Sequence, residues 1–184
     1  LSPSEKYDLL LGLDEFPLTH VMWSEGKVYY ENSNKKVERW LGICHGWAPA
    51  SFLMDRPLHQ ITVMSANKKT VIEFYPSDIK ALASLLWAKV QTPVLSMGGR
   101  CNKKNPAKNP AGRIIDPECF DINPSTWHQA VVNQVGVVGR SMIIDSSFDY
   151  QVWNQPVRSY KYAYFNPITL ERVDNLDAAV TPIE

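Results

Sequence analysis

The chain has 184 residues, of which 45% are hydrophobic and 11% aromatic, and these values are typical of one globular domain with a core of its own. Lysine and arginine total 19, as do aspartate and glutamate, so the balance of charge gives no support for binding to nucleic acid or to an anionic membrane. No apolar run reaches the roughly 18 residues of a membrane span. The chain begins with Leu rather than Met, which predicts a fragment of a longer precursor.

The N-terminal region predicts a short helix over residues 3–13. Ser4 is the expected cap, and an apolar stripe is expected at Tyr7, Leu10 and Leu11. Pro17 is expected to end this region, and residues 28–30 to form a short extended piece.

Two strands and a helix are predicted in the middle of the chain. Residues 58–64 and 70–74 have the composition of strands, joined by a polar loop at 65–69. Residues 76–78, Pro-Ser-Asp, are expected to open a helix that continues to Val90. The expected apolar face of this helix carries Ile79, Leu82, Leu86 and Val90, with Trp87 beside it.

Residues 43–52, Ile-Cys-His-Gly-Trp-Ala-Pro-Ala-Ser-Phe, contain the most suggestive cysteine. A helix is predicted from Cys44 to about residue 54, with Pro49 inside it. A cysteine in the first turn lies at the positive end of the helix dipole, which favours the nucleophilic thiolate. The unpaired amides of that turn can donate to an oxyanion. A buried structural cysteine is the alternative.

The other two cysteines, Cys101 and Cys119, bracket a segment rich in Asn, Lys, Pro and Gly. A disulfide between them would stabilise a segment that buries little apolar surface, by roughly 3 kcal/mol in the chain-entropy model. This pairing leaves Cys44 free, as in a secreted thiol enzyme; three reduced cytosolic thiols are the alternative. Asp116, Glu118 and Asp121 could hold calcium, although their spacing is not that of an EF-hand and a solvated acidic loop is the alternative.

Two β-type runs in the second half supply the remaining candidate residues. Residues 127–138 and 141–147 are predicted to pair about a turn at 139–140, which brings His128 near Asp145. Asp145 could then fix the tautomer of His128, leaving its other nitrogen to face the thiol. His45 is a poor candidate for the base because neighbours on a helix point about 100° apart.

The order Cys44, His128, Asp145 resembles the papain-like cysteine enzymes, in which the cysteine opens a helix in one lobe and the His and its partner come from a β-rich lobe. This resemblance implies an α+β fold with two lobes, about 1–100 and 101–184, in a single catalytic domain. Papain-like enzymes have a Gln six residues before the cysteine as an oxyanion donor, and this chain has Glu38 there. The candidates for the oxyanion hole are therefore a protonated Glu38, the Trp40 indole, Lys35 and Lys36.

Residues 152–158, Val-Trp-Asn-Gln-Pro-Val-Arg, resemble the start of the surface peptide of the oomycete transglutaminase elicitor family. Lys161 also keeps its place, whereas Ser159 and Tyr160 stand where that family has Gly-Phe. The cysteine segment, His128 and Asp145 are similar to the family as well, so the resemblance covers nearly the whole chain.

This resemblance implies a secreted, cell-wall transglutaminase that joins glutamine side chains to lysine amines in proteins. Cys44, His128 and Asp145 would carry out the reaction with no cofactor, and calcium is associated with the activity of the family. A plant immune receptor would bind residues 152–161 of a surface peptide at about 152–164, with Trp153 and Pro156 as exposed determinants outside the chemistry.

Two other functions stay open from the residues alone. A cysteine peptidase or amidase would use the same three side chains but resolve the thioester with water. A non-enzymatic cell-wall recognition module would depend only on the peptide at 152–161.

Overall fold

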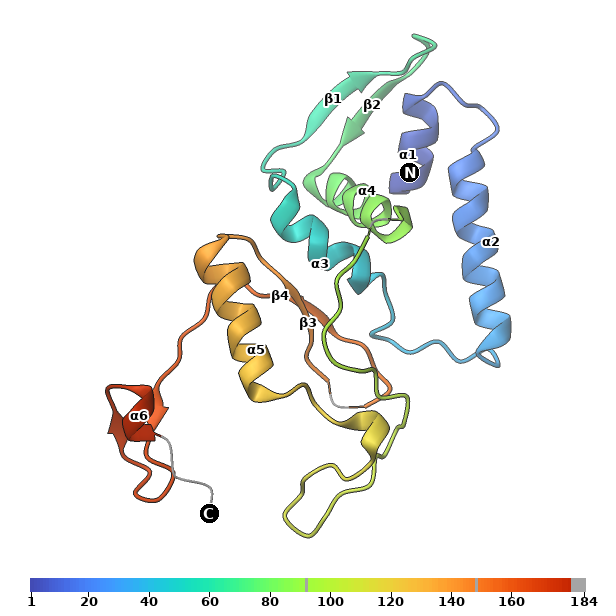
Figure 1. Ribbon diagram of the computed structural model, residues 1–184. Helices are drawn as coiled ribbons and strands as arrows, with labels where there is room; N and C mark the ends of the chain where they lie inside the picture. Colours follow the sequence, from blue (N-terminus) through green and yellow to red (C-terminus); the bar gives the residue numbers. More distant parts are fainter. Residues whose placement is uncertain (92, 148, 180–184) are drawn as a thin grey trace. The chain divides into compact units, whose positions relative to one another are not determined.

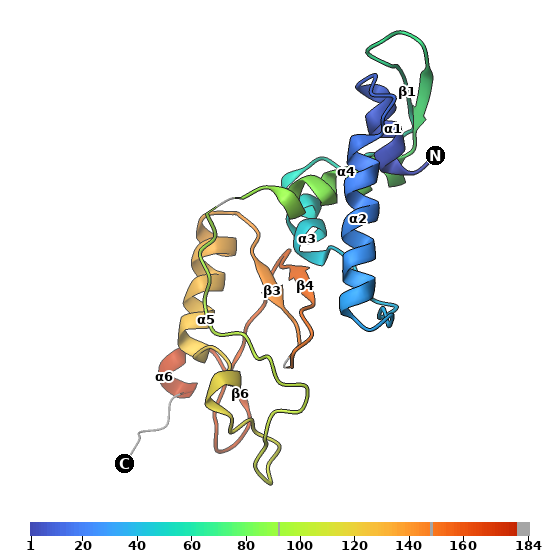
Figure 2. The ribbon, with the colours of Figure 1, turned by 90° about the vertical axis from the view of Figure 1, so that its right-hand side faces the viewer.

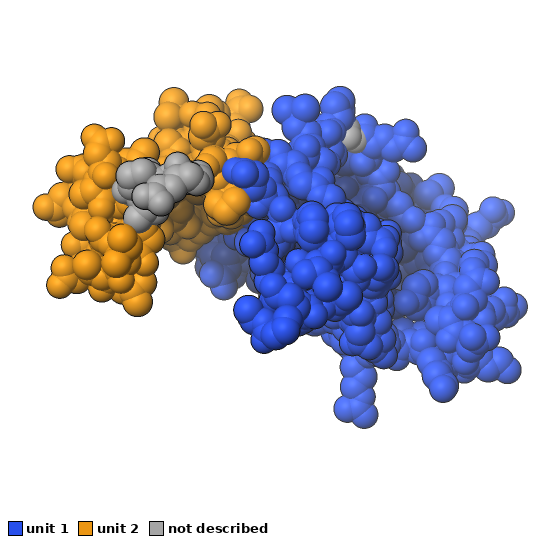
Figure 3. Space-filling model, turned by 60° about the horizontal axis from the view of Figure 1, so that its bottom comes forward, with its two compact units in different colours: residues 1–123, 143–156 blue, residues 124–142, 157–184 orange. Residues whose placement is uncertain are grey.

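The computed structural model describes residues 1–91, 93–147 and 149–179 (Figure 1). The chain divides into two compact units, which we describe separately and which Figure 3 colours differently. The first unit consists of Leu1–Asn123 and Ile143–Pro156, and the second of Pro124–Met142 and the chain from Val157 onward. The predicted lobe boundary near residue 100 lies inside the first unit. Helices and two-stranded antiparallel sheets occur together, which confirms the α+β class.

The first helix, α1 (Pro3–Leu10), begins with a capping box. The hydroxyl of Ser2 accepts from the Glu5 amide at 3.3 Å, and the Glu5 carboxylate accepts from the Ser2 amide at 2.6 Å. The cap is therefore Ser2 rather than the predicted Ser4, because Pro3 fits the first helical position, where no amide donor is needed. The predicted apolar stripe is also wrong, since the buried side chains of α1 belong to Lys6 and Asp8.

The second helix, α2 (Pro17–Asn32), corrects two predictions at once. Pro17 begins a helix instead of ending a region, and residues 28–30 are helical rather than extended. Asp8, only 1% exposed, organises this start: its carboxylate accepts from the amides of Leu18 and Thr19, at 3.0 and 2.9 Å, and from the Thr19 hydroxyl at 2.8 Å. A carboxylate at a helix N-terminus also interacts favourably with the helix dipole.

The predicted strand pair and the helix after it are confirmed. Strands β1 (Ile61–Met64) and β2 (Val71–Phe74) are antiparallel, with Ile61 opposite Phe74. Alternate residues of β2, Ile72 and Phe74, are each 3% exposed, so one face of this strand enters the core. Helix α4 (Pro76–Lys89) follows directly.

Helix α3 (Cys44–Leu53) confirms the helix predicted after the cysteine, and it packs on α4 (Figures 1 and 2). Small residues allow this close approach. A Cβ added at Gly46 would come within 2.0 Å of the Ser84 carbonyl oxygen and 2.7 Å of the Ala88 Cβ. Leu86 and Val90 are 59% and 45% exposed, so the predicted apolar face of α4 is wrong at these two positions.

A disulfide joins Cys101 and Cys119, as predicted, and leaves Cys44 as a free thiol. Cys119 is the last residue of the short 3-10 helix η1 (Pro117–Cys119). Residues 102–118, which the disulfide closes, are called the stapled loop below. Within it, an isolated antiparallel bridge pairs Lys108 with Ile114, so the loop has some internal order.

The last part of the first unit is a short hairpin of β3 (Ile143–Asp145) and β4 (Asn154–Pro156). The strands are antiparallel, with Asp145 opposite Asn154 and Ile143 opposite Pro156. The predicted pairing of residues 141–147 with residues 127–138 is therefore wrong: β3 pairs with the strand that follows it along the chain.

The second unit opens with helix α5 (Pro124–Val131), which continues as the π-helix η2 (Val132–Val137). The prediction of a strand over residues 127–138 is wrong, although its β-branched valines favour a strand. Pro124 at the start of α5 is well suited to the first turn of a helix. Strands β5 (Tyr164–Phe165) and β6 (Arg172–Val173) and helix α6 (Leu176–Ala179) complete this unit.

Candidate active site

The thiol of Cys44 lies at the first residue of α3, where the sequence predicts it. The first amide bonds of the helix run from Gly46 and Trp47 to the carbonyl of Ile43, each at 2.9 Å. The amides of Cys44 and His45 precede these bonds, as expected for donors at a helix start. The Cys44 side chain is half-buried, so a substrate group can approach it.

Strand β4 and the residues just before it contact this thiol. The Cys44 Sγ donates to the backbone carbonyl of Val152 at 3.4 Å, and the Asn154 side-chain amide donates to the same sulfur at 3.6 Å. The thiol is thus held between one acceptor and one donor. The sequence indicates Asn154 only as part of the surface peptide, because its contact with Cys44 depends on how β4 packs on α3.

Asp145 belongs to the same hairpin, directly across from Asn154. Three donors converge on its Oδ1: the Ser147 amide at 3.1 Å, the Ser147 hydroxyl at 2.8 Å and the Trp153 amide at 2.9 Å. This carboxylate therefore organises the connection between β3 and β4. An imidazole would have to approach Oδ2.

Trp40, a candidate for the oxyanion hole, contacts Trp153 of the surface peptide. The rings of Trp40 and Trp153 are tilted by 37°, with their centroids 5.2 Å apart. The Trp153 indole donates to the Gln151 side chain at 2.9 Å, and 36% of the residue is exposed. Pro156 is half-buried in β4. Within the first unit, the surface peptide and the thiol site are therefore contiguous.

Two other candidates near Cys44 in the sequence are exposed. Glu38, the first oxyanion candidate, accepts the Leu41 amide through its backbone carbonyl at 3.1 Å. His45 is exposed beside Cys44. In the described part of the chain, neither Glu38 nor His45 forms a hydrogen bond with the Cys44 thiol.

A lysine pairs with two of the three carboxylates considered for calcium. Lys103 Nζ lies 2.7 Å from both Asp116 Oδ1 and Glu118 Oε1, and the Asp116 carboxylate also accepts from the Ala107 amide. The hydrogen bond from Lys103 is the main reason that the pKa of Asp116 is lowered, and the bonds to Asp116 and Glu118 raise the pKa of Lys103. In this structure Asp116 and Glu118 are thus paired with Lys103. Among the described residues, no cluster of three His, Cys, Asp or Glu side chains could hold a metal.

His128 lies on α5 in the second unit, not on the predicted strand. Its ring meets Tyr162 edge to face, with centroids 5.0 Å apart, and Tyr162 in turn contacts Tyr160 and Tyr164. The imidazole therefore contacts a row of aromatic rings in the C-terminal half of the surface peptide. Cys44 and Asp145 belong to the first unit.

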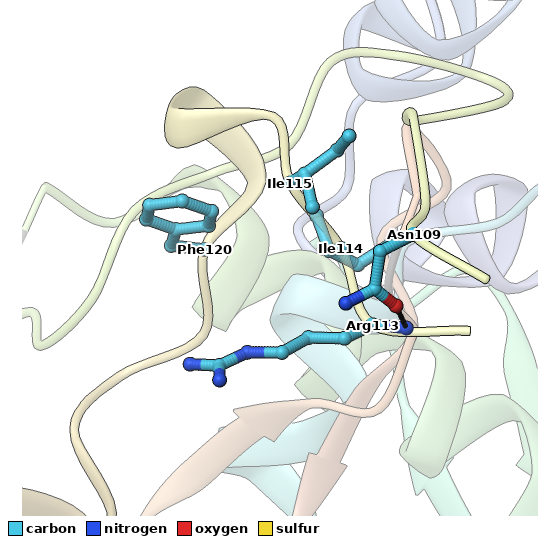
Figure 4. Close-up of a pocket in the computed structure, with 5 residues that line it drawn as sticks. All are labelled: Asn109, Arg113, Ile114, Ile115 and Phe120. Atoms are coloured by element: carbon cyan, nitrogen blue, oxygen red, sulfur yellow. Dashed lines mark hydrogen bonds between the residues drawn. The ribbon is translucent and has the colours of Figure 1, made fainter. Parts of the chain in front are cut away.

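A separate hollow of about 290 Å³ lies in the stapled loop (Figure 4). Its walls are Asn109, Arg113, Ile114, Ile115 and Phe120. The side chain of Asn109 is occupied by the turn itself, since it accepts from the amides of Ala111 and Arg113. None of the candidate catalytic residues lines this hollow.

One protein-family model matches most of the chain. The family model described as "Transglutaminase elicitor" matches residues 24–176. The chain belongs to the transglutaminase elicitor family. The match includes Cys44, His128 and Asp145, together with the surface peptide that begins at Val152.

Neither the curated proteins nor the solved structures contain a match to this member of the transglutaminase elicitor family. In the described part of the chain, no helix has both the length and the apolar character needed to cross a membrane.

Proposed function

We propose that this chain is a transglutaminase that forms isopeptide bonds between glutamine and lysine side chains of proteins. The observation that carries the proposal is membership of the transglutaminase elicitor family over residues 24–176, a span that contains a free thiol at a helix start. That position favours a nucleophilic thiolate and supplies amide donors for an oxyanion.

The first half of the reaction releases ammonia. Cys44 gives its thiol proton to the general base, and Sγ attacks the carbonyl carbon of a glutamine side chain, forming an S–C bond while the C=O π electrons become an oxyanion. When this adduct collapses, the C–N bond breaks and ammonia leaves with a proton from the general acid. A γ-glutamyl thioester remains on Cys44.

The second half transfers the acyl group to an amine. A lysine amine attacks the thioester and loses its proton to the general base, and cleavage of the C–S bond regenerates the thiol. We assign the acid and base roles to His128, with Asp145 as the carboxylate that orients it. The reaction is papain-like in its order of residues and needs no cofactor for these steps.

We also propose that residues 152–161 form a surface that a plant immune receptor binds. Of the two expected determinants, Trp153 is exposed and Pro156 is half-buried; exposure of Trp153 and of the nearby Arg158 supports access from outside. The disulfide and the family are compatible with an extracellular protein. Secretion to the cell wall is part of this proposal.

The test is incorporation of a fluorescent primary amine into a glutamine-rich protein by the wild type and by Cys44→Ala. We expect incorporation by the wild type and a loss of at least 1,000-fold in the variant, since the covalent step has no other thiol. A chelator arm examines calcium dependence. Wild type that incorporates no amine but releases ammonia from the glutamine protein would contradict the transglutaminase and favour an amidase.

A further inference from the structure

The side chain of Asn154 is the hydrogen-bond donor that the surface peptide directs to the sulfur of Cys44. Its Nδ2 lies 3.6 Å from Cys44 Sγ, within the range for a hydrogen bond to sulfur. An asparagine amide carries two N–H donors, so one can hold the sulfur while the other stays available.

Regular backbone pairing holds this side chain in place. Asn154 lies in β4 opposite Asp145 of β3, and β4 packs on α3, whose first residue is Cys44. Asn154 is half-buried, whereas the next residue, Gln155, is exposed, as expected for neighbours on a strand that point to opposite faces. The strand therefore directs one of its two adjacent amide side chains to the thiol.

We propose that Asn154 is a catalytic residue, the side-chain donor that stabilises the Cys44 thiolate and then the oxyanion of the glutamine adduct. This inference rests on the proposed transglutaminase function. The oxyanion forms on the carbon that becomes bonded to Sγ, so a donor that already touches Sγ reaches it by a small rotation. With the Cys44 amide, Asn154 completes a pair of donors of the kind found in an oxyanion hole.

Two of the side chains suggested by the sequence, Glu38 and Trp40, fit this role less well. An ionised Glu38 can only accept hydrogen bonds. Trp40 packs its ring on Trp153. The amide of Asn154 is an uncharged donor. It can stabilise the thiolate and then the oxyanion by hydrogen bonding, without giving up a proton.

A matched pair of substitutions tests the contact with the sulfur. Asn154→Asp and Gln155→Glu each add one carboxylate of nearly unchanged size to the same strand, but on opposite faces. The probe is the rate of iodoacetamide alkylation at pH 7, which reports Cys44 alone because the other two cysteines are disulfide-bonded.

We expect Asn154→Asp to slow alkylation at least tenfold, since a donor to the thiolate is replaced by a negative charge, and Gln155→Glu to stay within twofold of the wild type. Equal rates for the two variants, or a wild-type rate for Asn154→Asp, would overturn the proposal. Asn154→Ala, checked for an unchanged unfolding midpoint, gives the effect of the lost donor without added charge.

Amine incorporation then tests the oxyanion role. For Asn154→Ala we expect kcat to fall about 100-fold with KM changed less than threefold, the pattern of a donor that acts in the transition state. An unchanged kcat would overturn that role. The two failures are distinguishable: a wild type without turnover contradicts the proposed function, whereas alkylation does not depend on turnover and reports on Asn154 alone.

Discussion

At the scale of single residues, the buried ion pair between Lys6 and Asp78 joins helix α1 to helix α4. Their side chains are 10% and 11% exposed, and Lys6 Nζ lies 2.6 Å from Asp78 Oδ2. Asp78 also accepts the Tyr75 amide at the start of α4. Burial alone would raise the pKa of Asp78, but the hydrogen bonds from Lys6 and Tyr75 and the charge of Lys6 outweigh it and hold the pKa below its usual range.

We therefore predict that Asp78→Asn lowers the free energy of unfolding by about 3 kcal/mol at pH 7, since the Lys6 charge stays buried without its partner. Because the folded state lowers the pKa, the contribution of Asp78 is complete above the unfolded pKa and is lost as the pH falls through the folded pKa. Urea unfolding at several pH values measures both effects. The acid-dependent part should be missing from the variant.

The exposed pair of Lys89 and Glu25 provides the control. Its side chains are 50% and 51% exposed at a distance of 2.5 Å, so Glu25→Gln should cost less than about 1 kcal/mol. If both substitutions had the same small effect, burial of the Lys6–Asp78 pair would not be what makes it important.

At the scale of elements, the contact of α3 with α4 determines where the thiol can lie. We predict that Gly46→Ala lowers the free energy of unfolding by at least about 2 kcal/mol, because the added methyl group would meet backbone atoms of α4 and force the helices apart. Thermal unfolding and the alkylation rate of Cys44 measure the change. Gly26→Ala is the control: α2 leaves open space there, and removing a glycine from a helix should stabilise it by up to about 1 kcal/mol.

The elements that could be predicted from sequence are those with a local signal. Helix α3, helix α4 and the β1–β2 pair follow from composition and Pro or polar boundaries, and the disulfide follows from the unequal spacing of three cysteines. Helix α2 was missed because Pro17 was interpreted as a stop, although proline is equally suited to a first turn. The buried Asp8 carboxylate, which accepts from the first amides of α2, is recognisable only in three dimensions.

The candidate site also could be predicted only where the signal is local in the sequence. The prediction that Cys44 begins a helix rests on residues next to it in the sequence, and it is confirmed. His128 was assigned to a strand because valines dominate residues 131–138, and the short apolar run did not separate helix from strand. The role of Asn154 could not be predicted, since it arises from a contact between residues 110 positions apart.

At the scale of the molecule, the two units differ in how much they bury. Within residues 124–142 and 157–179, Val131 alone is buried, whereas α3, α4 and β2 of the first unit contain several buried side chains. Local opening is easier where fewer side chains are buried. We predict that the amides of α5 exchange with deuterium at least tenfold faster than those in the middle of α3 and α4, measured by mass spectrometry. Equal protection would mean that the second unit is as stable as the first.

The contacts of Cys44 also have a consequence for the order of events on the ribosome. The thiol leaves the ribosome first, followed by Cys101 and Cys119, and Val152 and Asn154, its partners 108 and 110 positions downstream, come last. Closing so long a loop is entropically costly and slow. While the 18 positions from Cys101 to Cys119 are being synthesised, Cys101 can pair with Cys44, which has already left the ribosome. A wrong bond between them would block the Cys44 thiol, and exchange to the native disulfide would then have to occur before the hairpin closes over that thiol.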